Sequence, residues 1–86
     1  MKIKNNQMHQ SSQLIIGQNI RKWRLLKEIK QEQLAAKLGI TKGALSNIEN
    51  NKTNISLQRI DEIAIILGLE SMKLFVNPID LILTLP

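Results

Sequence analysis

Residues 31–50 constrain the fold most, because they contain two short amphipathic segments that meet at a glycine. The apolar face of the first segment, residues 31–38, consists of Leu34, Ala35 and Leu38. Gly39 follows directly, and glycine readily adopts the left-handed conformation in which many helices end. Two short helices joined by three or four residues that include a glycine form a helix-turn-helix. The segment therefore predicts this motif.

The second segment runs from Lys42 to about Asn50 and begins after Thr41, whose hydroxyl can accept a hydrogen bond from the exposed amides of a first turn. Its apolar positions are Leu45 and Ile48, and Asn51 stands where the chain must turn left-handed. A generic pair of packed helices does not need a small residue, a glycine and this apolar set in one register. The pattern therefore favours DNA binding over a structural helical hairpin.

One further helix is predicted on each side of the motif. Residues 12–27 carry apolar residues at i, i+4 and i+7, the spacing of an amphipathic helix. These residues are Ile16, Ile20 and Trp23, and Leu14 and Leu26 widen the stripe. After the motif, Ser56 can cap a helix that ends at Gly68. Its inward positions are Ile60, Ile63, Ala64 and Leu67.

The two ends of the chain differ from this helical region. Residues 1–12 are polar and aperiodic, which predicts a flexible arm. Residues 13–69 hold the helical domain, and residues 70–86 form an extension. Within the extension, residues 70–76 fit a short helix and a strand about equally, so both alternatives stay open. The tail I-D-L-I-L-T-L-P is too apolar to leave in water, and we expect it to dock on this domain, on a second copy or on another protein.

Charge is unevenly distributed along the 86 residues, whose formal net charge is +5. Residues 1–59 carry eleven lysines and arginines against three glutamates, whereas residues 60–86 carry one lysine against four acidic residues. A basic part that faces a polyanion and an acidic part that faces something else would produce this distribution. A merely soluble basic protein would also produce it, so charge alone does not decide.

The residue inventory argues against catalysis and metal binding. The chain has no cysteine, and its single histidine, His9, lies in the polar arm. The usual zinc ligands are therefore missing, and a Ser/His/Asp arrangement would have to recruit that arm. We predict no enzymatic activity, no catalytic residue, no metal and no cofactor.

No apolar run approaches the roughly 20 residues that span a bilayer. Residues 1–12 also lack the apolar stretch of a signal peptide. We therefore expect a cytoplasmic protein with no membrane partner. A single core in a chain of this length is marginal, which makes oligomerisation a reasonable expectation.

About residues 14–69 resemble the Cro/C1-type (Xre family) helix-turn-helix domain of phage and bacterial repressors. The motifs Q-x-x-L-A-x-x-L-G-I-T and I-E-N-x-K carry the resemblance. It implies a compact, all-α, five-helix domain that binds double-stranded operator DNA as a two-fold homodimer and represses transcription.

The resemblance also assigns roles to single positions. The second helix of the motif would lie in the major groove, with its N-terminal side chains on base edges. The residues directed there are Thr41, Lys42, Gly43, Ala44, Ser46 and Asn47. Lys42 suits guanine O6 and N7, and Asn47 can bond adenine at two atoms. The glycine at position 43 has two interpretations. Either this position reads no base, or the missing side chain allows the helix to approach the groove closely. Phosphate contacts would come from Gln31, Asn50 and Lys52, with Lys30 adding positive charge beside them.

Arg24 and Glu49 occupy the positions of a partly buried salt bridge that holds the first helix against the recognition helix in this family. The alternative is two solvated surface charges, worth under about 1 kcal/mol. We favour the pair because an unpaired Glu49 would repel phosphate. The sequence departs from the family at Lys30, where an N-capping Ser, Thr or Asn is usual, and at Glu28, which replaces a common Gly or Asn.

The extension leaves two functions open. The stretch L-E-S-M-K-L-F-V is similar to the place where HipB-type antitoxins add a strand that pairs with the same strand of the other subunit, and the alternative is the family's ordinary fifth helix. The chain would then be either an antitoxin of a type II toxin-antitoxin operon, holding a HipA-like kinase toxin and repressing its own operon, or a stand-alone regulator with no toxin. The residues expected at the dimer or partner contact are Met72, Leu74, Phe75, Val76, Ile79, Leu81, Ile82 and Leu83.

Overall fold

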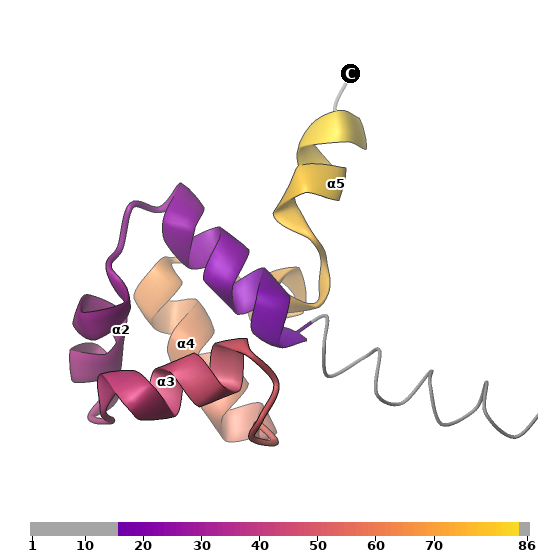
Figure 1. The fold of residues 1–86 in the computed structure, drawn as a ribbon. Coiled ribbons are helices and arrows are strands. Elements are labelled where there is room, and N and C mark those ends of the chain that lie inside the picture. The colour runs from indigo at the N-terminus through magenta and orange to yellow at the C-terminus, as the bar shows by residue number, and fades with distance from the viewer. Residues whose placement is uncertain (1–15, 85–86) are drawn as a thin grey trace, which may run out of the picture.

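The computed structural model describes residues 16–84, and its first helix covers residues 16–26 (Figure 1). The predicted arm, residues 1–12, lies outside the described residues, as does Leu14. The described residues form this helix, four further α-helices, one 3-10 helix and no strand. The elements after the first helix are α2 (Gln31–Leu38), α3 (Lys42–Glu49), α4 (Leu57–Leu67), η1 (Ser71–Phe75) and α5 (Pro78–Thr84). The all-α prediction is confirmed.

Side-chain hydroxyls begin two of the helices, as the sequence predicted. The Thr41 Oγ1 atom accepts a hydrogen bond from the Ala44 N–H at 3.0 Å at the start of α3. The Ser56 Oγ atom accepts one from the Arg59 N–H at 3.1 Å at the start of α4. Each bond satisfies an amide that the helix itself leaves without an acceptor.

The start of α2 is stabilised differently, because the Lys30 side chain has no acceptor atom. The Gln33 side chain supplies the bond in the opposite direction, since its Oε1 accepts from the Lys30 backbone N–H at 2.8 Å. This is one half of a capping box. The glutamine three residues into the motif thus compensates in part for the unusual residue at the cap.

Left-handed backbone conformations follow three of the helices. Gly39 after α2 and Gly68 after α4 each have φ 72°, and Asn51, beyond the end of α3, has φ 63°. Glu28, between the first helix and α2, also lies in this region, with φ 58°. It therefore adopts the conformation that favours glycine or asparagine, at a cost of about 1–2 kcal/mol for a residue with a Cβ.

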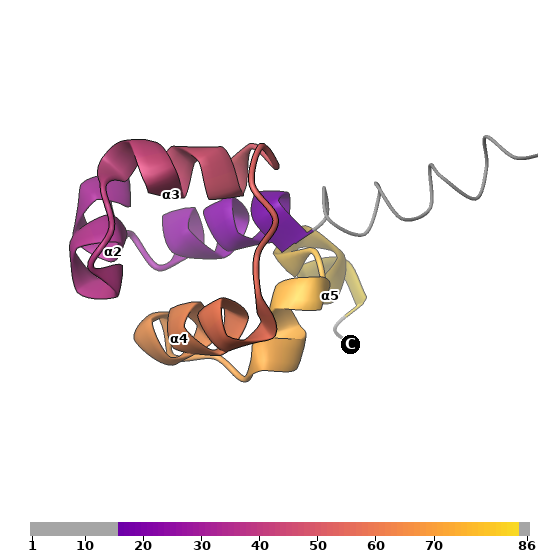
Figure 2. The ribbon, with the colours of Figure 1, turned by 90° about the horizontal axis from the view of Figure 1, so that it is seen from below.

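The core lies between the first helix, α2, α3 and α4, and η1 closes one end of it (Figure 2). Its buried apolar side chains are Ile16, Ile20, Leu34, Ala35, Leu45, Ile48, Ile60, Ile63, Ala64, Leu67 and Leu74. Trp23, Leu38 and Ile40 pack against it and are partly buried. The prediction for Leu26 is wrong, because this side chain is 49% exposed at the end of the first helix.

Residues 71–75 form a 3-10 helix, so the strand alternative for residues 70–76 is wrong. Two side chains of the first helix bond its backbone: Asn19 Nδ2 donates to the Leu74 carbonyl at 3.1 Å, and Trp23 Nε1 donates to the Lys73 carbonyl at 3.0 Å. These bonds occupy carbonyls that a pairing strand would use. Leu74 is fully buried beneath them, so it is not available for a dimer or partner contact.

Asn77 and Pro78 separate η1 from α5. The Asn77 Oδ1 atom accepts from the Ile79 N–H at 2.9 Å, and Pro78 is the first residue of the helix, where its missing N–H costs nothing. Figure 1 shows α5 projecting away from the other helices. This projection leaves the surface around η1 and α5 open to solvent.

The first helix approaches the end of α3 closely at Gly17. A Cβ built on Gly17 would lie 2.5 Å from the Ile48 carbonyl oxygen and 3.1 Å from the Glu49 carbonyl oxygen. Both obstacles are backbone atoms, so a rotamer change cannot relieve the contact. Only glycine allows the two helices to meet at this separation.

Replacing Gly17 with alanine should therefore destabilise the fold by about 1–3 kcal/mol, the usual cost of overpacking. The matched control is Gly43→Ala, because a Cβ there would meet nothing closer than Thr41 Oγ1 at 4.0 Å. The control should be neutral or stabilising by up to about 1 kcal/mol, since alanine favours helices. Urea unfolding of the two variants measures both values, and equal stabilities would contradict the close-approach argument.

Candidate nucleic-acid interface

The connection between α2 and α3 sets the angle at which α3 leaves the motif. The Gly39 N–H donates to the Ala36 carbonyl at 3.1 Å, and the Ile40 N–H donates to the Ala35 carbonyl at 3.0 Å. These two bonds close the end of α2 before Thr41 opens α3. Ala35 is buried in the core, and α2 packs against both α3 and α4.

A buried ion pair joins the first helix to the end of α3. Arg24 Nε donates to Glu49 Oε2 at 2.7 Å, and Arg24 Nη2 donates to Glu49 Oε1 at 3.1 Å. The two side chains are only 7% and 1% exposed. Arg24 Nη1 also donates to the Ile29 carbonyl at 3.0 Å. The expected pair is therefore present, and the alternative of two solvated surface charges is wrong.

Gln31 extends this cluster to α2. Its Nε2 atom donates to Glu49 Oε1 at 3.1 Å, a bond that the sequence did not predict. The first helix, α2 and α3 are thus tied together at one carboxylate. A side-chain amide carries two N–H donors, so one donor of Gln31 remains for a phosphate. Among the described residues, no buried side-chain nitrogen or oxygen lacks a hydrogen-bond partner.

The residues predicted to meet bases lie at the start of α3 and along it. Thr41, Lys42, Gly43 and Asn47 are exposed, and Ala44 and Ser46 are half-buried. Leu45 and Ile48 turn into the core, which leaves the polar positions of α3 outward. The open space around Gly43 means that packing within the domain does not require glycine there.

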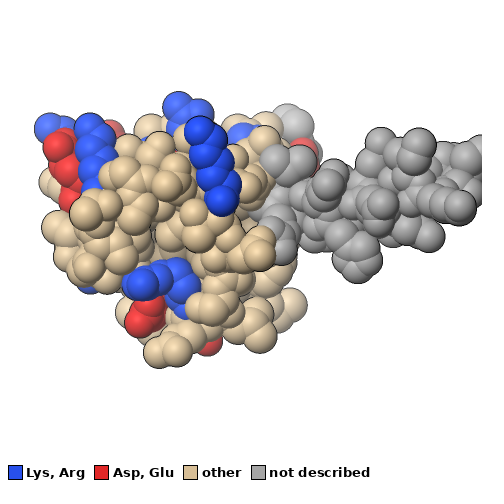
Figure 3. All heavy atoms as spheres, turned by 60° about the horizontal axis from the view of Figure 1, so that its bottom comes forward, with Lys and Arg blue, Asp and Glu red and all other residues tan. Residues whose placement is uncertain are grey.

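The residues predicted to meet phosphates flank this helix. Lys30, Asn50 and Lys52 are exposed, and Gln31 is half-buried. Asn50 Nδ2 donates to Ser46 Oγ at 3.2 Å, which orients the amide along the side of α3. The side of the molecule on which α3 lies has scattered Lys and Arg side chains on a largely uncharged surface (Figure 3). Such a surface suits a groove between two lines of phosphates.

A pocket of about 330 Å³ opens between α3 and the segment before α4. Its polar lining comes from Asn47, Thr53, Asn54, Ser56 and Arg59. Arg59 is held there by Glu62, whose Oε1 lies 3.0 Å from Arg59 Nη1. Sequence reasoning did not identify this pocket, because its walls come from separate elements.

The residues predicted for the dimer or partner contact, apart from the buried Leu74, divide into three groups. Met72, Phe75, Val76 and Ile79 are exposed, at 78%, 47%, 39% and 48%. Leu81 is half-buried. The Ile82 and Leu83 side chains lie outside the described set. The first two groups belong to η1, α5 and the turn between them.

Residues 20–74 match the helix-turn-helix family. The chain belongs to this family. Its domain is of the Cro/C1 (Xre) type that the sequence motifs implied. A relative from Neisseria meningitidis serogroup B, described as a hypothetical transcription factor, is 30% identical over 69 residues. The match covers 80% of this chain and 65% of that protein's length.

Three solved structures have a similar fold. The hypothetical transcription factor NHTF from Neisseria has a TM-score of 0.76 at 28% identity, covering 88% of this chain and 87% of that one. The restriction-modification controller protein C.AhdI from Aeromonas hydrophila has 0.69 at 30% identity, covering 74% and 97%. SinR, a master regulator for biofilm formation solved in complex with DNA, has 0.64 at 35% identity, covering 71% and 98%.

Among the described residues, no helix has the length and apolar character that crossing a membrane requires.

Removing the Glu49 charge should test how strongly the buried pair holds the motif. Glu49→Gln leaves Arg24 charged in a buried site, and losing one partner of a buried pair costs about 3–5 kcal/mol. The control is Glu62→Gln, which breaks the pair with Arg59, whose side chains are 33% and 45% exposed. That change should cost under about 1 kcal/mol. Thermal and urea unfolding compare the two variants, and similar small losses would mean that the buried pair is dispensable.

Proposed function

We propose that this protein binds double-stranded DNA in a sequence-specific manner and regulates transcription, as a binding protein without catalysis or a cofactor. The observation that carries the proposal is that α3 begins with exposed polar residues while the cluster of Arg24, Gln31 and Glu49 holds its other end. A short helix whose orientation is fixed and whose outer side is polar suits the major groove. The complex of the related SinR with DNA supports the same partner.

Two residues of α3 are the proposed base readers. Lys42 is exposed and forms no ion pair with the described residues, so its ammonium is available for guanine O6 and N7. Asn47 is exposed one turn later, and its amide can both donate to and accept from adenine. Thr41, Ala44 and Ser46 lie beside them and offer hydroxyl or methyl contacts.

Backbone contacts in this proposal come from both sides of α3. Gln31 lies at the N-terminus of α2, where free amides and the helix dipole also favour a phosphate. Asn50 and Lys52 follow α3, and Lys30 adds a charge beside Gln31. These contacts fix the position of the protein on DNA and do not select sequence.

We further propose a homodimer that acts as a repressor by covering its operator. The apolar side chains on η1 and α5 support this assembly, because Met72, Phe75 and Ile79 together leave an apolar surface in water. A second copy would cover it, and two-fold symmetry would present two α3 helices to two half-sites.

The same surface could instead hold a protein toxin, such as a HipA-like kinase, in which case the chain is also an antitoxin. The alternative is a stand-alone Xre-type regulator. Purification from the native host distinguishes the two, because an antitoxin would arrive with a stoichiometric second polypeptide. A clean homodimer would remove the antitoxin proposal.

Selection from random duplexes should yield an operator, and the affinity for it should fall with salt, with a log–log slope of about −0.9 per neutralised phosphate.

On that operator, Asn47→Ala should relax preference at one base position in each half-site by about 1–3 kcal/mol. The comparison variant Lys52→Gln should instead weaken all sequences equally and reduce the salt slope by about 0.9. Fluorescence anisotropy titrations at several salt concentrations measure both. A uniform loss in Asn47→Ala would assign that residue to the backbone.

Placing a charge on the proposed dimer surface should separate the subunits. Ile79→Asp should give a monomer in sedimentation velocity and lower operator affinity, because two half-sites are no longer bound together. Ile65→Asp is the matched control, since Ile65 is 76% exposed on α4 outside the proposed surface. That variant should sediment as the wild type. A dimer in both variants would locate the subunit contact elsewhere.

A further inference from the structure

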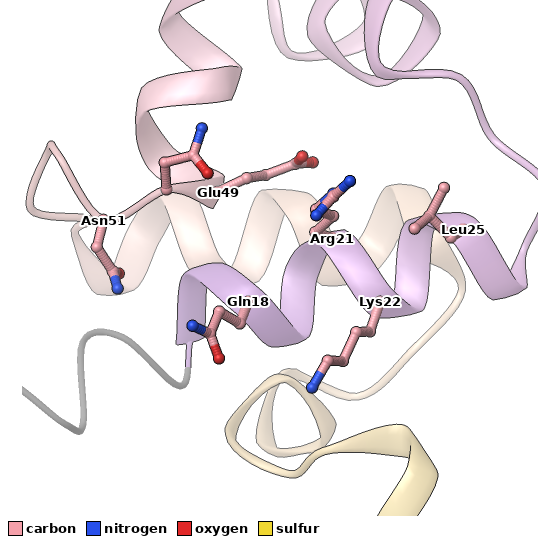
Figure 4. Close-up of a pocket in the computed structure, with 7 residues that line it drawn as sticks. Gln18, Arg21, Lys22, Leu25, Glu49 and Asn51 are labelled. Atoms are coloured by element: carbon pink, nitrogen blue, oxygen red, sulfur yellow. The ribbon is translucent and has the colours of Figure 1, made fainter.

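A second pocket, of about 270 Å³, lies between the first helix and the end of α3 (Figure 4). One wall consists of Gln18, Arg21, Lys22 and Leu25, and the other of Glu49, Asn50 and Asn51. The first four residues recur at i, i+3, i+4 and i+7, so one face of the helix forms the whole wall. The pocket borders the candidate interface, because Asn50 belongs to both.

Arg21 is the one arginine among the described residues that forms no hydrogen bond or ion pair with them. Arg24 is paired with Glu49, and Arg59 is paired with Glu62. Figure 4 shows the Arg21 side chain on the α3 side of the first helix, whereas Lys22 points toward the C-terminal segment. An exposed guanidinium thus stands beside the end of the helix proposed to enter DNA.

The carboxylate in this pocket does not cancel the charge of Arg21. Both Glu49 oxygens already accept hydrogen bonds, Oε2 from Arg24 and Oε1 from Arg24 and Gln31. Arg24 therefore neutralises Glu49 within the cluster. Arg21 remains as an uncompensated positive charge on the pocket wall, which Asn50 also lines.

We propose that this pocket binds one phosphate of the DNA backbone, with Arg21 as the principal contact and Asn50 as the second. The assignment rests on the proposed DNA-binding function and adds a residue that the family motif does not indicate. A guanidinium presents paired N–H donors that match the oxygens of a phosphate. The phosphate would lie at the C-terminal end of α3, beside Glu49, which Gln31 reaches from α2. The first helix would then contribute its own contact to the docking of α3 on the DNA backbone.

The test compares Arg21→Gln with Lys37→Gln on the selected operator. Both variants lose one positive charge from an exposed side chain, but Lys37 lies on α2 outside the pocket. Arg21→Gln should lower affinity roughly tenfold at low salt, the size of a lost charged hydrogen bond. It should also reduce the salt slope by about 0.9 and leave the base preferences unchanged. Lys37→Gln should bind as the wild type does, and circular dichroism melting should show both variants folded.

Replacing single operator phosphates with neutral methylphosphonate identifies the bound group. At one position in each half-site, the neutral group should lower the affinity of the wild type. The same replacement should leave the affinity of Arg21→Gln unchanged. Three results would overturn the proposal: wild-type binding by Arg21→Gln, loss of preference at one base, and conversion of the dimer to a monomer in sedimentation. The last would mean that Arg21 bonds a carboxylate of a second copy. If the wild type selects no sequence, the proposed function fails, while the Arg21 contact is still measurable as a salt slope on any duplex.

Discussion

The buried ion pair between Arg24 and Glu49 is the interaction on which the candidate interface depends. It lies where the first helix, α2 and α3 meet, and Gln31 brings the start of α2 into the same set of bonds. Two hydrogen bonds between a planar guanidinium and a carboxylate allow little rotation, so the end of α3 is held in both position and direction. The pair also has an electrostatic role. A carboxylate beside a groove lined with phosphates would oppose binding, and Arg24 neutralises it without occupying the outer side of α3.

An eight-residue helix is too short to be stable by itself, so α3 depends on what holds its two ends. Thr41 satisfies an amide at its start, and Gly17 lets the first helix reach the backbone at its end. Between them, Leu45 and Ile48 supply the buried face. Most of the outward side chains of α3 are therefore not needed to hold the helix in place. This division explains how Gly43 can be tolerated at an exposed position, where its effect on packing is negligible.

The pair of Arg24 and Glu49, 25 residues apart, was expected from the resemblance to the family. Reasoning from the residues themselves succeeded where the physical cause is local. The caps at Thr41 and Ser56, the left-handed turns at Gly39 and Asn51, and the apolar spacing of α4 all depend on residues within one or two turns of each other. It failed where the partner is a distant backbone atom. Asn19 and Trp23 bond carbonyls 55 and 50 residues away, and a carbonyl acceptor leaves no mark on the sequence. For the same reason the sequence did not decide between helix and strand at residues 70–76, and it assigned Leu74 to a dimer or partner contact although the core of this domain contains it.

The first helix is the common wall of the two surfaces that the proposed regulator would use. Gln18 and Lys22 line the pocket beside α3 that Arg21 also lines. They also line another pocket, near α5, whose other walls include Phe75, Val76 and Asp80. A subunit that docks against η1 and α5 would therefore contact the back of the helix whose other side holds Arg21. In a dimer, that contact would set the distance between the two α3 helices, which must match about 34–36 Å for half-sites one helical turn apart. Subunit docking and phosphate binding would then constrain the same rigid element, so a change at either surface alters how well both half-sites are engaged.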